Sequence, residues 1–358
     1  MKVLHFSDLH LDHAFLDDDF SILTGRERRE TLKAILADIC ALARSESADV
    51  VTVAGDLFDA ETIMPATLTM LSEAFADLAP IPVLIAPGLS DLYGADSLYA
   101  RWSFPDNVHV FRSEMPTAYN VEPGFTVWGM AVAKAPLYEN LHRIRLQSGV
   151  NLFLAHIAEA SSLKTELAAV GIDYALLGGE HCYREFDGGV YPGSPEVLEP
   201  HLQACSHGVA VLTITPDSVS VRHIETGRWS YATHEIDVSN CANENDLEQL
   251  IQATIDQDGD DQRLHTVILT GEPRCAIRID QLQNRLRGYV TFSMRLRPPY
   301  DLDALASEPT VRGLLVSRCM EQMAAMPSDQ HAHLLNKLQL ALQALDGIEV
   351  PYNAIDPD

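Results

Sequence analysis

Short apolar runs that end in polar loops recur through the first two thirds of the chain. They cover residues 3–6, 50–54, 83–86, 151–156 and 174–178. Between the first two runs, apolar residues at helical spacing predict an amphipathic helix. Strands that alternate with helices are typical of a layered α/β fold, and such folds place their sites at the strand ends. We therefore expect a layered α/β domain whose strand ends carry the chemistry.

Length and charge limit the classes of function. With 358 residues, the chain can form one large domain and a smaller one. No apolar run approaches the roughly 18 residues of a membrane span, and the start M-K-V-L-H-F-S-D is unlike a signal peptide. We therefore expect a cytoplasmic protein that does not contact a membrane. The net charge of −26 argues against unaided DNA binding, although a basic partner could supply that surface.

The six cysteines are scattered along the chain without a C-x-x-C pair. Zinc-finger and disulfide-framework patterns both fail on this spacing. We predict free, mostly buried thiols.

Three segments are predicted from the change of pattern along the chain. The alternating region covers residues 1–230 and closes with a hairpin of two strands joined by a Pro-Asp-Ser turn. A small α+β domain follows at 231–300, and its first part, 235–261, has nine acidic residues and no Lys or Arg. Two helices, near 303–325 and 328–345, are expected in the last segment, 301–358.

Potential metal ligands follow four of the predicted strands. Asp8 and His10 are two residues apart just past the first strand, so both can reach one ion. Asp56 follows the second strand, while His156 and His181 lie at later strand ends. Oxygen and nitrogen ligands together favour Mn²⁺, Zn²⁺ or Fe over Ca²⁺. The alternative is a coincidence of helix caps and structural histidines.

The strand V-L-I-A is followed by P-G-L-S-D, which carries little chemistry for a strand end. It offers Leu89, Ser90 and Asp91, where the other strand ends offer Asp, His and Glu. Leucine cannot bind a metal, and a serine hydroxyl is a weak acid near neutral pH.

The successive motifs resemble those of calcineurin-like metallophosphoesterases. They are F-S-D-L-H-L-D, A-G-D-L-F-D, the strand before Gly88, L-A-H, D-Y-A-L-L-G-G-E-H and V-Y-P-G-S-P-E. The match covers about residues 1–225 and is most similar to the SbcD/YhaO branch, nuclease subunits of double-strand-break repair complexes. The resemblance implies a layered β-sandwich flanked by helices, a small capping domain and C-terminal helices that bind a partner.

The resemblance also implies a site for two Mn²⁺ ions that activate a water against a phosphodiester. Asp8, His10, Asp56 and His181 match the ligands of the first metal, with Asp56 bridging to the second. For the second metal, only His156 matches. Leu89 replaces an Asn ligand, Gly179 replaces a His ligand, and Ser90 replaces the histidine expected to protonate the leaving group. Glu180 and Asp91 are further candidate ligands.

Three functions remain open from the sequence. The favoured one is a family member that retains the fold and one Mn²⁺ site, has weakened or lost hydrolysis, forms a homodimer and acts with an SbcC-like SMC-type ATPase. That partner would bring DNA to the complex. The first alternative is an active DNA exo- or endonuclease with an altered or single-metal site. The second is a phosphoesterase acting on a small nucleotide, which suits the acidic charge.

Two nearby features have both a structural and a functional interpretation. His13 either lines the site or lies on the surface. Residues 191–194, Y-P-G-S, are expected to form a tight turn under the site that is structural first and substrate-facing second.

Overall fold

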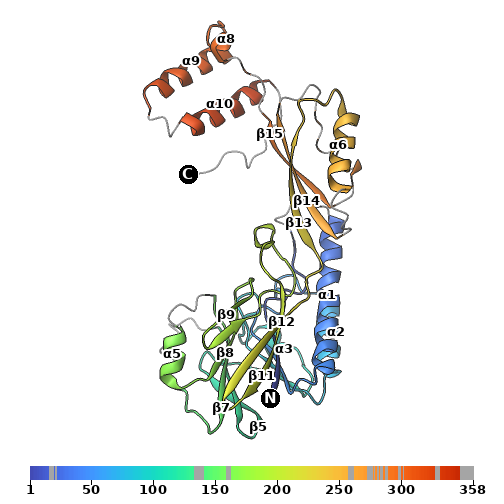
Figure 1. The fold of residues 1–358 in the computed structure, drawn as a ribbon, viewed down its shortest axis with the longest axis vertical. Helices are drawn as coiled ribbons and strands as arrows, with labels where there is room; N and C mark the ends of the chain where they lie inside the picture. Colours follow the sequence, from blue (N-terminus) through green and yellow to red (C-terminus); the bar gives the residue numbers. More distant parts are fainter. Residues whose placement is uncertain are drawn as a thin grey trace. The chain divides into compact units, whose positions relative to one another are not determined.

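The computed structural model describes most of the chain in two compact units (Figure 1). The described residues are 1–15, 20, 22–132, 141–158, 163–256, 262–271, 277, 279, 282, 285–286, 289–296, 300, 302–326 and 331–346. The first unit comprises Met1–Tyr231 with Asp261–Leu264, and the second Ala232–Asp260 with His265–Asp358. The domain boundaries expected at 230 and 300 stay predictions.

Two six-stranded sheets form the first unit. One has the order β12-β11-β1-β2-β3-β4, from β12 (Ser218–Glu225), β11 (Gly208–Thr215), β1 (Lys2–Phe6), β2 (Val50–Val53), β3 (Val83–Ile85) and β4 (Val108–Val110). The other has the order β5-β6-β7-β8-β10-β9, from β5 (Thr117–Glu122), β6 (Phe125–Gly129), β7 (Val150–His156), β8 (Tyr174–Gly178), β10 (Gly189–Tyr191) and β9 (Arg184–Phe186). In both sheets the central strands run parallel, so their carboxyl ends meet at one edge.

Alternate residues of each central strand face opposite layers. On β1, Val3 joins a buried cluster shared with Leu152 of β7 and Leu176 of β8, so the two sheets pack face to face. Its neighbour Leu4 packs instead with Leu32 of helix α1 (Ile22–Ser45) and with α2 (Pro65–Ala76). The helices α3 (Leu98–Arg101) and α5 (Leu163–Val170) and the 3-10 turn η1 (Pro200–Leu202) complete the described helical elements of this unit. The expected layered β-sandwich is confirmed.

A histidine lies between the two sheets as part of the core. The Nδ1 atom of His5 is 3.0 Å from the Thr52 hydroxyl, and its Nε2 atom is 3.1 Å from the Leu177 carbonyl oxygen. Burial lowers the pKa of His5 to about 4, although both hydrogen bonds oppose that shift. The folded protein therefore holds this imidazole neutral at pH values where the unfolded chain already binds a proton.

Acid should therefore destabilise the protein through His5. Its pKa is lower in the folded state than the ordinary 6.5, so its contribution is complete above pH 6.5 and is lost as the pH falls towards about 4. We expect a loss of roughly 3 kcal/mol across that window. Urea unfolding at several pH values gives the free energy of unfolding as a function of pH. Between pH 6.5 and about 4 this free energy should fall less steeply with pH for His5→Gln than for the wild type. The exposed control His201→Gln should follow the wild type, and the same pH dependence in all three proteins would contradict the role of His5.

The second unit contains a three-stranded sheet and the C-terminal helices. The sheet has the order β13 (Ser230–Asp237), β14 (Arg263–Gly271) and β15 (Val290–Leu296), with β14 and β15 parallel. Helix α6 (Glu244–Asp256) buries Leu247 and Ile251 in the core of this sheet, while its acidic residues remain outside.

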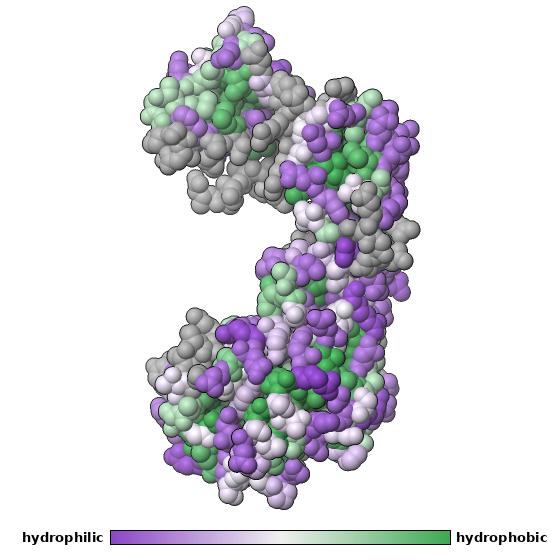
Figure 2. Space-filling view, in the orientation of Figure 1, coloured by the Kyte–Doolittle hydropathy of each residue, from purple (hydrophilic) through white to green (hydrophobic). Residues whose placement is uncertain are grey.

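Within the described residues of the C-terminal segment, 302–326 and 331–346, there is one helix more than the sequence predicted. The helix expected near 303–325 is divided into α8 (Leu302–Ala306) and α9 (Val311–Ala324). The division occurs because Thr310 caps α9, its hydroxyl oxygen accepting a 3.1 Å hydrogen bond from the Gly313 amide. Helix α10 (His331–Leu345) packs on α9 through Val316, Leu338 and Leu342. Figure 2 shows hydrophobic residues gathered where these helices meet. Among the described residues, no helix is both long and apolar enough to cross a membrane.

The prediction that all cysteines are free thiols is wrong. Cys182 and Cys205 form a disulfide, with their Cα atoms 5.2 Å apart. The fold brings them together because the loop after β8 runs beside the segment that leads into β11, where the Tyr183 amide donates to the Ser206 carbonyl. Cys40 and Cys319 are free, and Cys275 lies outside the described residues. The separation of 23 residues contains no pattern that would reveal the pair.

Candidate metal centre

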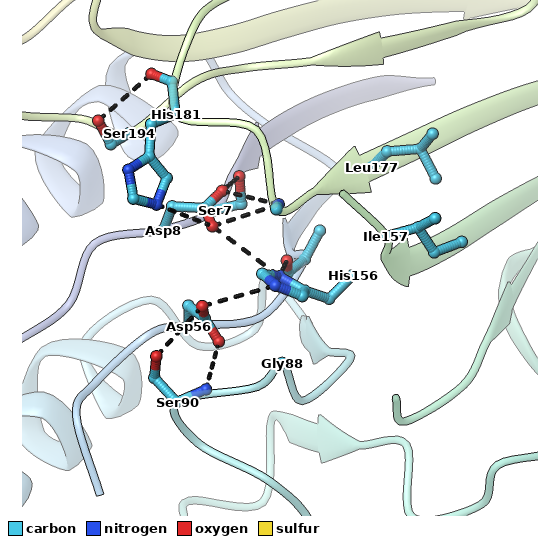
Figure 3. A network of polar contacts seen from close by, with 12 residues as sticks. Ser7, Asp8, Asp56, Gly88, Ser90, His156, Ile157, Leu177, His181 and Ser194 are labelled. Atoms are coloured by element: carbon cyan, nitrogen blue, oxygen red, sulfur yellow. Dashed lines mark hydrogen bonds and ion pairs between the residues drawn. The ribbon is translucent and has the colours of Figure 1, made fainter. Parts of the chain in front are cut away.

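The polar loops after β1 and β2 are joined by backbone hydrogen bonds. The Asp8 amide donates to the Gly55 carbonyl at 3.0 Å, and the His10 amide donates to the Asp56 carbonyl at 2.9 Å. His156 ends β7 of the opposite sheet, and His181 lies in the loop after β8. All five predicted ligands therefore come to one edge of the sandwich. Figure 3 shows Asp8, Asp56, His156 and His181 converging there.

The backbone at this edge adopts conformations that are rare for side-chain-bearing residues. Asp8, His10 and Asp56 have φ angles of 55°, 50° and 49°. Each such residue costs on the order of 1–3 kcal/mol and persists only where its surroundings fix it. Gly55, at φ 81°, has no such cost, and a Cβ atom there would lie 2.7 Å from His156 Nδ1. The chain accepts local strain to aim these carboxylates and imidazoles inward.

The ligand atoms fall into two groups that share Asp8. Asp8, His10 and His181 form one, and Asp8, Asp56 and His156 form the other, with the ligand atoms of each group within 4.8 Å of one another. Asp56 joins the two groups, since its Oδ2 atom is 3.6 Å from His10 Nε2 and 3.5 Å from His156 Nε2. Such an arrangement agrees with the bridging role that the resemblance to metallophosphoesterases implies for Asp56.

Two of the histidines are held in the tautomer that metal binding requires. His156 Nδ1 is 2.9 Å from the Ala54 carbonyl oxygen, which can only accept, so Nδ1 carries the proton and Nε2 faces Asp56. His10 Nδ1 is 2.6 Å from a carboxylate oxygen of Asp59. Its Nε2 atom is buried and has no hydrogen-bond partner among the described residues. A histidine anchored at Nδ1 with a free Nε2 is the common geometry of a metal ligand.

Negative charge dominates the electrostatics of the centre. Burial alone would lower the pKa of His10, but Asp59, Asp56 and Asp8 raise it to about 9. The pKa of Asp59 is below its usual range: burial opposes this shift, and the hydrogen bonds from His10 and His13 outweigh it. Burial lowers the pKa of His181, although Asp8 opposes that shift. His10 thus attracts a proton to the position that a cation would take, and metal binding would have to displace it.

These donors fit a divalent transition-metal ion. Buried carboxylates and imidazole Nε2 atoms within a few ångströms suit Mn²⁺, Zn²⁺ or Fe, and the unpartnered Nε2 of His10 points to a missing partner. Asp8, His10, Asp56 and His181 would hold the first ion. His156 and Asp56, with Asp8 shared between the two groups, are what the chain offers to a second. Their role as metal ligands stays a prediction that this geometry supports.

Asp59 is a site residue that sequence reasoning missed. Its two oxygens accept hydrogen bonds from His10 Nδ1 at 2.6 Å and from His13 Nδ1 at 2.7 Å. His13 therefore lies beside the site and is hydrogen-bonded to Asp59, which is not one of the five predicted ligands. The only sequence signal was the position of Asp59 at the end of A-G-D-L-F-D, three residues after Asp56.

Removing Asp59 should weaken metal binding by about 10- to 100-fold, because His10 would lose the partner that fixes its ring and tautomer. Calorimetric titration of Asp59→Ala with Mn²⁺ measures this. The matched control is His13→Ala, which removes the other partner of the same carboxylate and should change the affinity much less. Equal losses in the two variants would contradict the orienting role of Asp59.

The loop after β3 approaches Asp56 but supplies no ligand side chain. The Ser90 amide donates to Asp56 Oδ1 at 2.8 Å and the Ser90 hydroxyl to Oδ2 at 3.3 Å. Leu89 points outward and is 61% exposed. Gly88 is required here because a Cβ atom would collide with the Asp56 carboxylate. The loop thus occupies both oxygens of Asp56 with hydrogen bonds.

Asp91 holds this loop in place rather than facing the centre. Its oxygens accept from the amides of Gly88 at 2.6 Å, Leu57 at 2.8 Å and Asp56 at 3.1 Å, and from the Tyr99 hydroxyl at 2.7 Å. Burial and the charge of Asp56 raise the pKa of Asp91, and burial raises the pKa of Tyr99 well above its usual value. With four donors on one carboxylate, the geometry does not favour Asp91 as a metal ligand.

Glu180 is also engaged elsewhere. Arg184 binds its carboxylate through both Nε and a terminal guanidinium nitrogen, and the guanidinium carbon lies 4.8 Å from the centre of the Tyr191 ring. Gly179 has a φ of 97°, and a Cβ atom there would meet His156 Nε2 at 3.2 Å. The resemblance implies one histidine ligand for a second metal at position 179, and in this conformation neither Gly179 nor Glu180 supplies a ligand there.

Comparison with known proteins places the chain in a family. A model of the calcineurin-like phosphoesterase family matches residues 1–183. No curated protein matches the chain.

Three solved structures are similar, each over 62% of this chain. They are TT1561 of Thermus thermophilus (15% identity, 98% of that chain, TM-score 0.40), a dimetal phosphatase from Danio rerio (12%, 95%, 0.39) and purple acid phosphatase from yellow lupin (Lupinus luteus) seeds (14%, 51%, 0.36). The family model covers just over half of the chain, including Asp8, His10, Asp56, His156 and His181. The chain therefore belongs to the calcineurin-like phosphoesterase family.

Proposed function

We propose that this protein is a metal-binding phosphoesterase-fold subunit whose hydrolysis of phosphodiesters is weakened or lost. The observation that carries the proposal is the contact of Ser90 with Asp56. Where the family motif has an Asn ligand and an acidic histidine, this chain has an outward-facing Leu89 and a serine that donates twice to Asp56. The Asp56 carboxylate, which the resemblance expects to bridge two ions, instead accepts hydrogen bonds from the loop that the family motif expects to supply a ligand and an acid.

The first metal position keeps its full set of donors. Asp8, His10, Asp56 and His181 would hold one divalent ion, for which we propose Mn²⁺. A bound ion of this kind supplies a water of lowered pKa. The carboxylates and imidazoles of the chain position it, with Asp59 orienting His10. No imidazole lies at position 90 to protonate a leaving oxygen, and a general acid is typically worth a factor of about 10² to 10⁴.

The setting we propose is DNA repair or defence, by resemblance to the SbcD/YhaO branch. In that setting the chain forms a homodimer and acts with a long SMC-type ATPase similar to SbcC. Because the chain has a net charge of −26, we propose that the partner provides the basic surface that binds DNA. A cytoplasmic location stays a prediction from the sequence.

A second candidate is an active nuclease that uses a single metal. The unpartnered Nε2 of buried His10 favours it, because a complete first position can bind and polarise a phosphodiester without the second. A phosphoesterase acting on a small nucleotide is a weaker alternative and rests on the acidic charge alone.

Cleavage assays separate these functions. With Mn²⁺ present, single-stranded DNA, double-stranded DNA and a cyclic dinucleotide should all be cleaved no faster by the wild type than by Asp56→Ala. Cleavage of either DNA that disappears in Asp56→Ala would establish the nuclease and contradict the main proposal. Cleavage of the dinucleotide alone would establish the nucleotide phosphoesterase.

A further inference from the structure

Among the described residues beside it, no carboxylate lies within hydrogen-bond distance of either ring nitrogen of His181, whose ring meets that of His10 edge-on with 5.5 Å between the ring centres. The Nε2 atom of His181 is 3.9 Å from Asp8 Oδ1 and its Nδ1 atom is 3.9 Å from Glu199 Oε1. Both distances exceed a hydrogen bond. His10 and His156, by contrast, are each anchored at Nδ1 within 3 Å. The His181 ring is therefore held by its main chain and by its contact with the His10 ring, without a hydrogen bond at Nδ1 like those of His10 and His156.

That main chain is held from one side by a compact set of contacts. The Ser194 amide donates to the His181 carbonyl at 3.0 Å, and the Ser194 hydroxyl is 3.4 Å from the same oxygen (Figure 3). The next residue, Cys182, is joined to Cys205 by the disulfide. One residue further, the Tyr183 amide donates to the Ser206 carbonyl at 3.2 Å. Three consecutive residues are thus fixed, and only the middle one covalently.

The other end of the disulfide is itself anchored to the core. His207, two residues after Cys205, is buried, with Nδ1 at 3.0 Å from the Ser194 hydroxyl and Nε2 at 3.0 Å from the Leu202 carbonyl. Strand β11 starts at Gly208, and its amide donates to the Ser194 carbonyl. The Y-P-G-S turn that ends at Ser194 therefore has the structural role expected of it first, and its substrate-facing role stays a prediction. The disulfide therefore connects the His181 loop to the segment before β11, which is itself anchored to the core.

We propose that the Cys182–Cys205 disulfide is a positioning device for His181, so that metal affinity depends on the redox state of this pair. The inference rests on the proposed metal site. A dithiol reductant such as dithiothreitol would break the S–S bond. Each sulfur then gains one electron and one proton to become a thiol, and the reductant loses the same two electrons and two protons as it closes its own disulfide. The loop is then held by hydrogen bonds alone, and His181 loses its fixed distance to Asp8.

The test is calorimetric titration with Mn²⁺ alone, after mass spectrometry has counted the thiols. Four proteins are compared: the oxidised wild type, the wild type reduced with dithiothreitol and freed of it without air, Cys182→Ser/Cys205→Ser, and the control Cys319→Ser. We expect the reduced and doubly substituted proteins to bind Mn²⁺ about 10- to 100-fold more weakly than the oxidised wild type. The control, which changes a free thiol in α9, should bind like the wild type.

A double-mutant cycle with His181→Ala separates positioning from a general loss of structure. If the disulfide acts through His181, removing it in the His181→Ala background should cause no further loss of affinity. Equal Mn²⁺ affinities of the oxidised and reduced proteins would overturn this inference but not the proposed function. So would a loss of affinity on removal of the disulfide that is as large in the His181→Ala background as in the wild type. Two free thiols at these positions in the protein purified without reductant would also overturn it. Failure of the oxidised wild type to bind Mn²⁺ would instead contradict the proposed function.

Discussion

Replacing Leu89 with Asn and Ser90 with His should raise Mn²⁺-dependent hydrolysis of an alkyl phosphodiester by at least about 10²-fold, the lower value typical of a general acid. The family motif places an amide ligand and an imidazole at these positions, and this chain has neither. In the wild type, Ser90 instead occupies both oxygens of Asp56. The substituted loop would release Oδ2 and present an acid to the leaving oxygen.

The choice of substrate shows whether the gain comes from the acid. A p-nitrophenolate leaves without being protonated, so bis(p-nitrophenyl) phosphate should gain little from Ser90→His. An alkyl diester such as DNA needs the proton and should gain most. Ser90→Ala is the control, because it removes the hydroxyl contact with Asp56 without adding an acid. A wild type that already cleaves DNA as fast as the double variant would show that another group supplies the proton.

Removing the Asp91 carboxylate should destabilise the first unit by about 3–5 kcal/mol, the usual cost of deleting one side of a buried, charge-assisted network. Asp91 is 1% exposed and accepts hydrogen bonds from three amides and the Tyr99 hydroxyl. In Asp91→Ala, all four donors would be buried without an acceptor. The two metal-site loops at Asp56 and Gly88 would also lose the side chain that joins them.

Urea unfolding of Asp91→Ala and of Asp96→Ala measures this effect. Asp96 lies five residues further along the same loop, but its side chain is 91% exposed and pairs with the exposed Arg101. Its removal should change the free energy of unfolding by no more than about 0.5 kcal/mol. Asp91→Asn, which retains one acceptor oxygen, should fall between the two. Similar stabilities for Asp91→Ala and Asp96→Ala would show that Asp91 is not the buried anchor of the loop.

Much of the fold was predictable because apolar runs and helical spacing report burial directly. The strands that precede Asp8 and Asp56, and those that end at His156 and Gly178, lie where these patterns place them, and their parallel pairing brings the ligands to one edge. The hairpin of β11 and β12 was predicted by its Pro-Asp-Ser turn. These features depend on local sequence and on the general geometry of parallel sheets.

Some features that the sequence did not predict depend on contacts between distant segments, and others depend on local side-chain contacts that no sequence pattern specifies. Cys182 and Cys205 pair only because two loops run side by side. Asp59 orients His10 through a turn whose geometry no spacing specifies. The pairing of Glu180 with Arg184 depends on the rotamers chosen in a loop. The division between α8 and α9 depends on the cap at Thr310, which competes with a continuous helix.

The number of metal ions bound per chain tests the central claim most directly. Saturating the oxidised protein with Mn²⁺, removing excess ion by gel filtration and measuring manganese by mass spectrometry gives this number. The account predicts one ion per chain, because only the first metal position has the full set of donors that the family motif implies. Asp8→Ala should lose this ion, and Glu180→Gln should retain it. Two ions per chain in the wild type would contradict it, by showing that the second position is complete despite Leu89, Ser90 and Gly179.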